Sequence, residues 1–268
     1  MQYRTEPALL RELSQMLRAG GIEDAELEAK WICEDAADAA QAREIAARRA
    51  AHEPLQYLLG KWEFYGLPVS VGRGVLIPRA DTETLVEAVL QRVPDKKEQR
   101  LADLCTGSGC IALALAVHLP QSRIIALEKS PDALRYAVQN TAENGLTDRV
   151  CVAEADVLDP AEAVKYRGLT AIVSNPPYLT GEEMLHLQRE VQFEPETALR
   201  GGADGLRFYR GIAALWRESL MPGGLIAFEI GYRQAAAVAG ILHENGYVQI
   251  ETVRDLSGNE RVVLGRRG

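Results

Sequence analysis

The sequence predicts an α/β fold in which a doubly wound, mostly parallel sheet of seven strands follows a small helical domain. Two observations carry this prediction. After residue 80, short apolar runs typical of buried strands alternate with segments of helical period. Before residue 60 the chain is alanine-rich and helical, and a short alternating stretch between the two parts is typical of a β-hairpin. We therefore expect a helical domain over residues 1–60, a β-hairpin linker over 61–80 and the sheet domain over 81–268.

Three helices are expected in the N-terminal domain. The first has Pro7 in its first turn and ends at Gly20-Gly21. Its apolar face is formed by Leu9, Leu10, Leu13, Met16 and Leu17. The second helix begins near Asp24, and the third covers about residues 39–52. These helices either pack as an appendage on the sheet domain or dock the substrate, and the sequence leaves both interpretations open. The hairpin is expected over Trp62–Val71, around Gly66.

The sheet domain should contain strands and helices in alternation. The expected strands are Arg100–Cys105, Arg123–Glu128, Val150–Ala155, Leu169–Ser174, Leu225–Ile230, Val248–Val253 and Arg261–Gly265. The expected helices are Thr82–Arg92, Ile111–His118, Pro131–Asn144, Leu206–Leu220 and Gln234–Asn245. Because no full helix separates the last two strands, they should form a terminal hairpin that gives the sheet one antiparallel member.

Composition and charge exclude several classes of protein. An apolar content of 47% and a charged content of 25% are typical of a soluble globular protein, and no run suits a membrane span or a signal peptide. The net charge of −8 argues against direct binding of nucleic acid along its phosphates. The cysteines and histidines form no metal-ligand motif, so neither a metal site nor a disulfide framework is expected. We expect a cytoplasmic protein with reduced thiols.

The tetrapeptide Asn175-Pro176-Pro177-Tyr178 is the most informative motif. It follows the strand Leu169–Ser174, at the carboxyl end where open α/β sheets bind their ligands. The prolines fix the turn and remove two N–H donors, which leaves one side-chain amide and acceptor carbonyls beside a phenol ring. This set suits a planar NH₂ group, because the Asn175 side-chain oxygen and the Pro176 carbonyl can each accept one hydrogen. An ordinary proline-rich turn is the alternative.

Three earlier strand ends suit an adenosine ligand. The first strand runs into a turn with Gly107 and Gly109, where a ligand can approach main-chain N–H groups at the start of a helix. The second ends in Glu128, at the spacing at which an acidic side chain binds the two hydroxyls of a ribose. The third is followed by Asp156, which can accept from an adenine amine. Each carboxylate taken alone could simply cap a helix at the surface, but the two together with the glycine turn favour a binding site.

These motifs resemble those of amino-group methyltransferases that use S-adenosyl-L-methionine. The shared features are Asp103-x-x-x-Gly107-x-Gly109, Glu128, Asp156 and Asn175-Pro-Pro-Tyr178. Four further stretches resemble the release factor glutamine methyltransferases (the PrmC/HemK family). They are Pro54–Gly60, Gly74–Glu83 (GVLIPRADTE), Phe193–Pro195 with Ala198-Leu199, and Gly201–Leu206. The resemblance covers about residues 54–265 and implies a Rossmann-like methyltransferase sheet.

The resemblance also implies the activity and the residues that perform it. A methyl group would pass from S-adenosyl-L-methionine to the glutamine amide of the Gly-Gly-Gln motif in class I peptide chain release factors. The implied catalytic residues are Asn175, Pro176 and Tyr178, and the substrate would contact these and Pro177. The implied cofactor-binding residues are Asp103, Cys105, Thr106, Gly107, Ser108, Gly109, Glu128, Asp156, Val157 and Asn175. Cys105 stands where such enzymes often carry a glycine, and we expect its backbone to be extended because a positive φ would strain it.

Other functions keep some support from single motifs. A glutamine methyltransferase acting on a ribosomal protein would share the chemistry, and a DNA adenine methyltransferase would share Asn-Pro-Pro-Tyr but need a basic groove. A non-catalytic nucleotide-binding module would explain the glycine turn and leave the tetrapeptide without a purpose. The glutamate-rich segment 179–203 is either an acidic lid that faces a basic partner or a solvated charge run on a helix.

Overall fold

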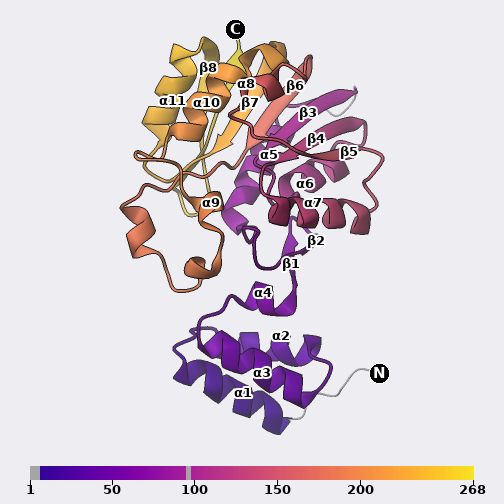
Figure 1. Cartoon of the computed structure of the whole chain (residues 1–268), viewed down its shortest axis with the longest axis vertical. Coiled ribbons are helices and arrows are strands. Elements are labelled where there is room, and N and C mark those ends of the chain that lie inside the picture. Colours follow the sequence, from indigo (N-terminus) through magenta and orange to yellow (C-terminus); the bar gives the residue numbers. More distant parts are fainter. Residues whose placement is uncertain (1–6, 95–97) are drawn as a thin grey trace.

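The structure is a computed structural model that describes residues 7–94 and 98–268. It contains a helical unit, a two-stranded hairpin and a seven-stranded sheet covered by helices on both faces (Figure 1). The first six residues of the predicted helical domain lie outside the described residues.

The helical unit has a hydrophobic core of its own. Its helices are α1 (Pro7–Ala19), α2 (Ala25–Asp35) and α3 (Ala39–Ala50), and all three were predicted. Leu13, Leu17 and Ile32 are fully buried between them. The Asp38 side chain accepts the N–H groups of Ala40 and Gln41, which fixes the start of α3. The short helix α4 (Leu55–Leu59) was not predicted, because five residues are too few to display a helical period.

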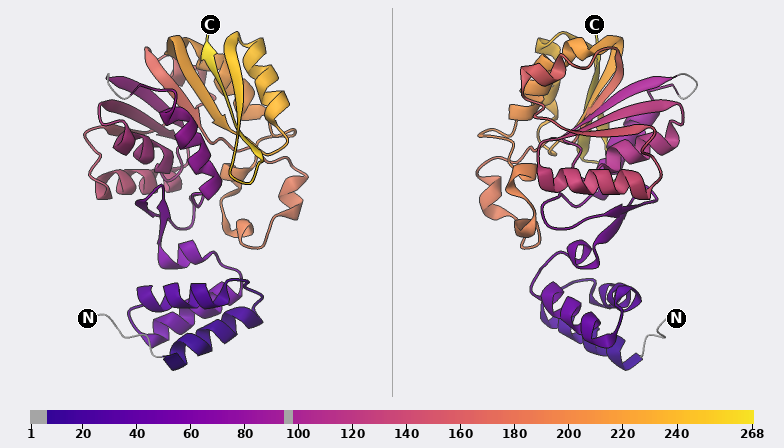
Figure 2. Two further views of the ribbon diagram at one scale, coloured as in Figure 1. Left: turned by 180° about the vertical axis from the view of Figure 1, so that it is seen from behind. Right: turned by 45° about the vertical axis from the view of Figure 1, so that its right-hand side comes forward.

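The hairpin is closed by a two-residue turn. Strands β1 (Lys61–Phe64) and β2 (Leu67–Ser70) pair antiparallel, and Tyr65 and Gly66 both have positive φ values, 52° and 75°. This is the backbone that tight hairpins favour. Phe64 and Val69 pack into the core of the sheet domain, so the hairpin joins the helical unit to the sheet domain (Figure 2).

The large sheet has the strand order β5-β4-β3-β6-β7-β9-β8. The strands are β3 (Gln99–Leu104), β4 (Ser122–Glu128), β5 (Val150–Glu154), β6 (Leu169–Ser174), β7 (Leu220–Glu229), β8 (Tyr247–Arg254) and β9 (Glu260–Arg267). Only β9 runs antiparallel to its neighbours in this sheet, which confirms the predicted terminal hairpin with one antiparallel member.

Helices cover both faces of this sheet. They are α5 (Glu83–Leu90), α6 (Cys110–His118), α7 (Pro131–Glu143), α8 (Pro160–Ala163), α10 (Arg207–Leu215) and α11 (Ala235–Glu244). Helices α5, α6 and α7 pack on one face with the hairpin, while α8, α10 and α11 pack on the other. No helix among the described residues has the length and apolar character needed to span a membrane.

Two predicted boundaries were wrong. The predicted helix over 206–220 ends at Leu215 and is followed by the 3₁₀ turn Arg217–Ser219, and β7 begins already at Leu220. The register with β6 shifts between Leu169 and Ala171, which lets the strand absorb a glycine-containing irregular stretch. The segment 179–203 forms two 3₁₀ turns, Glu183–His186 and Val191–Phe193, and the short helix α9 (Glu196–Leu199), not one charged helix.

Candidate active site

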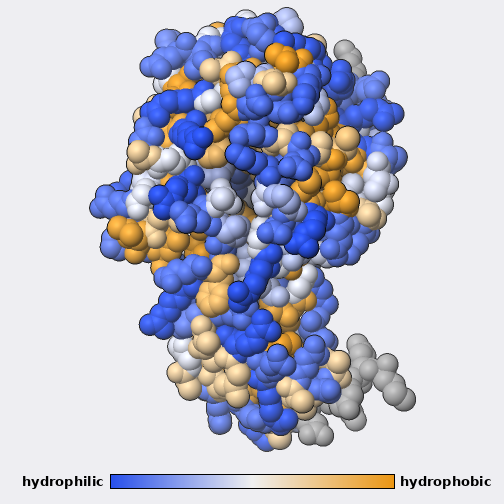
Figure 3. Space-filling view, viewed as in Figure 1, coloured by the Kyte–Doolittle hydropathy of each residue, from blue (hydrophilic) through white to orange (hydrophobic). Residues whose placement is uncertain are grey.

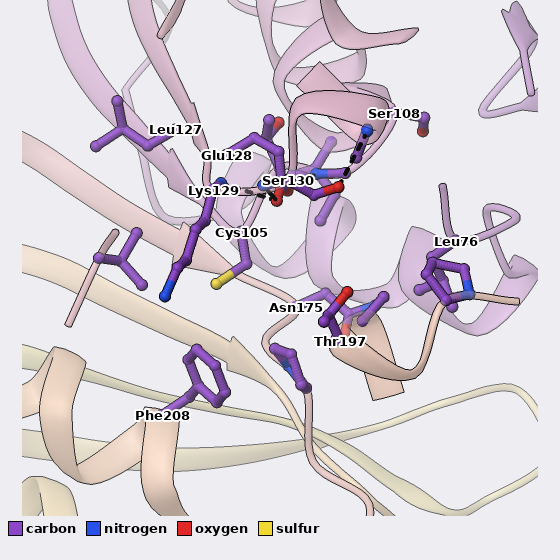
Figure 4. A pocket seen from close by; sticks show the side chains of 18 of the residues that line it. Leu76, Cys105, Ser108, Leu127, Glu128, Lys129, Ser130, Asn175, Thr197 and Phe208 are labelled. Atoms are coloured by element: carbon purple, nitrogen blue, oxygen red, sulfur yellow. Dashed lines mark hydrogen bonds between the residues drawn. The ribbon is translucent and has the colours of Figure 1, made fainter. Parts of the chain in front are cut away.

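A cavity of about 580 Å³ lies at the carboxyl ends of the central parallel strands. Its wall includes the turn after β3, the ends of β4 and β5 and the residues after β6, closed on one side by parts of segments 74–82 and 195–208 (Figure 4). From β3 the sheet is built outward in two directions, with β4 and β5 on one side and β6 and β7 on the other. The cavity therefore occupies the topological switch point where doubly wound sheets bind their ligands.

The turn after β3 does not have the backbone that we predicted for it. Cys105 has φ 61°, so the expectation of an extended backbone at this residue was wrong. The chain turns sharply there because the Thr106 N–H donates to the Leu127 carbonyl at 3.0 Å, and Gly107 (φ 58°) and Gly109 (φ 85°) continue the turn. A left-handed conformation costs a non-glycine residue about 1–2 kcal/mol. The strain is located in the cavity wall, into which the Cys105 sulfur points (Figure 4).

Glu128 connects the glycine turn to the next strand. One of its carboxylate oxygens accepts the Gly107 N–H at 2.9 Å, and the other accepts the N–H groups of Lys129 and Ser130, both at 2.8 Å. The side chain also lines the cavity. Each carboxylate oxygen has more than one lone pair, so Glu128 can hold the turn and accept further hydrogen bonds from a ligand.

Asp103 lies beneath the turn and does not line the cavity. It is fully buried, and one of its oxygens accepts from the Thr106 hydroxyl and from the Ala112 N–H at 3.2 Å. Its other oxygen, Oδ1, has no hydrogen-bond partner in the described part of the chain. Burial raises the pKa of Asp103 to about 7, against the effect of these two hydrogen bonds. Its direct contact is with the turn.

Asp156 lines the same cavity and is bound to Lys129. The distance between Lys129 Nζ and Asp156 Oδ2 is 2.7 Å, and Asp156 Oδ1 accepts the Leu158 N–H at 3.0 Å. Burial opposes the ionisation of Asp156, but these two interactions outweigh it and lower its pKa. Asp156 is therefore ionised at neutral pH. Apolar side chains from several elements line the same cavity: Leu76, Ile111, Leu127, Val157 and Phe208.

The tetrapeptide contributes two of its residues to the cavity wall, Asn175 and Pro177. The Asn175 Nδ2 donates to the Thr82 hydroxyl at 3.3 Å, which leaves Asn175 Oδ1 to accept from a ligand. The backbone of Tyr178 is fixed by Gln234, whose Nε2 donates to the Tyr178 carbonyl at 3.1 Å. Burial raises the pKa of Tyr178 to about 12, so its phenol is neutral.

Most of the predicted site residues lie together at this cavity. Those in its wall are Cys105, Thr106, Gly107, Ser108, Glu128, Asp156, Val157, Asn175 and Pro177. Asp103, Gly109, Pro176 and Tyr178 are adjacent in the chain or beneath the wall and are not part of it. The sequence reasoning missed Thr82, Arg79, Lys129 and Phe208 as lining residues, and it missed Asn140. The last is fully buried, accepts the Ser70 N–H at 2.7 Å and donates to the Ser108 carbonyl at 2.9 Å.

Most glutamates of segment 179–203 are bound within the chain. Glu190 accepts from Arg49 at 3.0 Å and lies 2.9 Å from the His52 ring nitrogen, which joins the segment to the helical unit. Glu194 and Glu196 pair with Arg79 and Arg200, and Glu183 accepts from Thr180. The contacts of Glu190 and Glu194 anchor the segment to the rest of the chain, whereas those of Glu183 and Glu196 lie within it. Polar and charged side chains cover much of this face of the molecule (Figure 3).

Comparison with known proteins places the chain among methyltransferases. Residues 79–202 match the model of the family described as Methyltransferase small domain. A release factor glutamine methyltransferase from Thermodesulfovibrio yellowstonii is 42% identical over 225 residues, which cover 83% of this chain and 79% of the relative. One of the same name from Moorella thermoacetica is 41% identical, covering 96% of this chain and 97% of the relative.

Solved structures show the same fold at low identity. The hMettl16 catalytic domain in complex with the MAT2A 3'UTR hairpin 6 superposes with a TM-score of 0.60 at 18% identity, covering 84% of this chain and 82% of that one. The fold and the cavity thus define an S-adenosyl-L-methionine-dependent methyltransferase. The chain belongs to the release factor glutamine methyltransferase family.

Proposed function

We propose that this enzyme methylates the side-chain amide nitrogen of the glutamine in the Gly-Gly-Gln motif of class I peptide chain release factors. The observation that carries the proposal is the position of Asn175, whose amide lines the same cavity as the glycine turn and Glu128. The family supports the choice of glutamine and of release factors.

The cavity fits S-adenosyl-L-methionine by the chemistry of its donor and acceptor groups. Glu128 would accept from the ribose hydroxyls, and Asp156 from the adenine amine, between the apolar side chains of Leu127, Val157 and Phe208. The turn around Gly107 and Ser108 would face the methionine part. When bound, the cofactor supplies a methyl group activated on a sulfonium sulfur.

The residues of the tetrapeptide would orient the acceptor. A carboxamide nitrogen is a poor nucleophile because its lone pair is delocalised into the carbonyl group. Asn175 Oδ1 and the Pro176 carbonyl would accept its two N–H bonds, hold the nitrogen in place and favour the positive charge that develops on it. Such fixed acceptors supply several kcal/mol of transition-state stabilisation. Tyr178, kept neutral by burial, would stack against the plane of the substrate amide or form part of the pocket that holds it.

The parts of the chain would divide the work. Residues 81–268 would bind the cofactor and transfer its methyl group. Residues 61–80 would link this domain to residues 1–60, which would dock the release factor. The support is the separate core of the helical unit and its ionic contact with Glu190, in the segment that also supplies Pro195–Ala198 to the cavity wall. A docking role predicts a much higher KM for a short Gly-Gly-Gln peptide than for the whole factor. From this substrate we infer that the enzyme works in the cytoplasm and does not contact nucleic acid directly.

The test is a labelled methyl-transfer assay with the whole protein. Purified class I release factors, ribosomal proteins and DNA are offered in parallel with S-adenosyl-L-methionine. We expect transfer to release factors and none when the Gly-Gly-Gln glutamine is replaced by alanine. Transfer to a ribosomal protein would favour that glutamine methyltransferase activity, and transfer to DNA would refute the proposal.

A further inference from the structure

A buried carboxyl lies in the strand next to the one that leads to Asn175. Glu229 is the last residue of β7, and Ser174 of β6 pairs with Phe228, so Asn175 and Glu229 occupy neighbouring positions just beyond this pair. Glu229 is only 1% exposed, and its Oε2 has no hydrogen-bond partner among residues 7–94 and 98–268. The proposed function gives this carboxyl no role.

Thr82 lies between the two side chains. It is 2% exposed, its hydroxyl accepts from Asn175 Nδ2 at 3.3 Å, and as a donor near Glu229 it opposes the rise in the pKa of that carboxyl. A hydroxyl has one proton to donate. When Thr82 gives that proton to a Glu229 carboxylate, it can only accept from Asn175. The amide of Asn175 must then turn its NH₂ group toward Thr82 and its oxygen away from it.

We propose that Glu229 and Thr82 are positioning residues that fix the side-chain amide of Asn175 with its oxygen toward the cavity. The inference rests on the proposed function, because this oxygen is the one that would accept from the substrate glutamine. It gives a role to the buried Glu229, which the proposed function leaves without one.

The protonation of Glu229 should control this arrangement. A protonated Glu229 can itself donate to the Thr82 oxygen, and the hydroxyl proton is then free to be donated to the oxygen of a rotated Asn175 amide. Burial raises the pKa of Glu229 to about 7, against the hydrogen bond from Thr82 and the positive charges of Arg261 and Arg79. The other ionisable groups that interact with Glu229 are Asp81, Tyr178, Tyr209 and Cys110. Since a carboxyl ionises above its pKa, the productive orientation should be lost as the pH falls below about 7.

The first test observes the amide itself and needs no release factor. The full-length protein is labelled with ¹⁵N-asparagine, and the side-chain NH₂ resonances of Asn175, assigned by their loss in Asn175→Asp, are followed from pH 5.5 to 8.5. We expect a titration with a midpoint near 7 in the wild type and in Thr82→Ser, and a flat response in Glu229→Gln and Thr82→Val. Asp103→Asn controls for the other buried carboxyl with a pKa of about 7, and the titration should persist in it. A titration that survives in Glu229→Gln would overturn the inference.

The second test measures single-turnover methyl transfer at saturating cofactor, with cofactor affinity measured separately. Thr82→Val and Glu229→Leu should each slow transfer about tenfold, the rate equivalent of one hydrogen bond, without changing cofactor affinity. Thr82→Ser should keep the wild-type rate, and the double variant should be no slower than either single one, because the two residues act in one chain of contacts. Glu229→Gln should also lose the fall in rate below pH 7. A wild-type rate in Thr82→Val or Glu229→Leu would overturn the inference. A wild type that transfers to no release factor would instead refute the proposed function, and the resonance titration would still decide the role of Glu229.

Discussion

Glu194 accepts the backbone N–H of Ile77 at 3.1 Å, although 117 positions separate them in the chain. The same carboxylate pairs with Arg79, and its side chain is only 1% exposed. The contact joins two of the stretches on which the family resemblance rests, Phe193–Pro195 and Gly74–Glu83. Both stretches contribute to one wall of the cavity, so this buried pair holds that wall together.

Loss of the Glu194 carboxylate should loosen this wall. Glu194→Ala leaves the Ile77 N–H and the Arg79 guanidinium without their acceptor, which costs about 1–3 kcal/mol for the N–H group alone. We expect faster proteolysis within residues 179–203, faster hydrogen exchange at Ile77 and weaker cofactor binding. Glu182→Ala is the matched control, because Glu182 is exposed on the same segment. Equal protease sensitivity of the two variants would contradict the anchoring role.

Glu128 should be essential for cofactor affinity and dispensable for folding. Glu128→Ala should weaken S-adenosyl-L-methionine binding by about 1–3 kcal/mol, the range for charge-assisted hydrogen bonds, measured by calorimetry. Glu154→Ala is the control, since Glu154 is paired with Glu128 in the sheet but exposed at the end of β5. Unchanged affinity in a folded Glu128→Ala protein would remove Glu128 from the site.

The backbone of Cys105 can be tested by substitution. At φ 61° a glycine relieves the steric strain, whereas a β-branched side chain increases it. Cys105→Val should therefore be less stable than Cys105→Gly by about 1–3 kcal/mol in urea unfolding. Cys151→Val, at an exposed position of β5, should change stability little. Equal stability of the two Cys105 variants would show that no left-handed strain exists there.

Local patterns predicted the strands, the longer helices and the strand-end residues of the candidate site. Asn175 and Glu128 could be predicted because the carboxyl end of a buried strand fixes where the next side chain lies. The backbone of Cys105 could not, since its positive φ results from the hydrogen bond between Thr106 and the neighbouring strand. The contact of Thr82 with the site could not be predicted for a similar reason. Its partner Asn175 is 93 positions away, and a local sequence pattern carries no information about such a contact.

Stability should fall as the pH rises through the range in which the buried carboxyls titrate. Burial raises the pKa values of Asp103 and Glu229 to about 7, whereas unfolded carboxyls ionise near pH 4. Between these values the folded state holds protons that the unfolded state has released, so the free energy of unfolding decreases with rising pH. Hydrogen bonds from His52 and Arg49 outweigh burial and lower the pKa of Glu190 to about 2, so its opposite contribution is complete above pH 5.

Asp103→Asn removes one of these two titrations. Urea unfolding from pH 5 to 8 should give a clearly smaller loss of stability in this variant than in the wild type. Glu154→Gln, which changes an exposed carboxyl, should keep the wild-type slope. If Asp103→Asn also keeps that slope, Asp103 is already ionised in the folded protein at pH 5.

Asn175 should govern transfer and leave cofactor binding almost unchanged. Asn175→Ala removes one of the two acceptors that would orient the glutamine amide, while the prolines keep the shape of the turn. Single-turnover transfer at saturating cofactor should fall by about two or more orders of magnitude, as when one preorganised hydrogen-bonding group of an active site is lost.

Asn175→Asp separates charge from fit. It keeps an acceptor and adds a negative charge in the cavity, which should favour a bound sulfonium, so cofactor affinity should be at least that of the wild type. Transfer should still fall, because the charge stabilises the ground state and disturbs the fit to an amide. Asn259→Asp, at an exposed position between β8 and β9, is the control for the substitution itself. Wild-type transfer by Asn175→Ala would refute the mechanism, because the acceptor amide would then be oriented without this side chain.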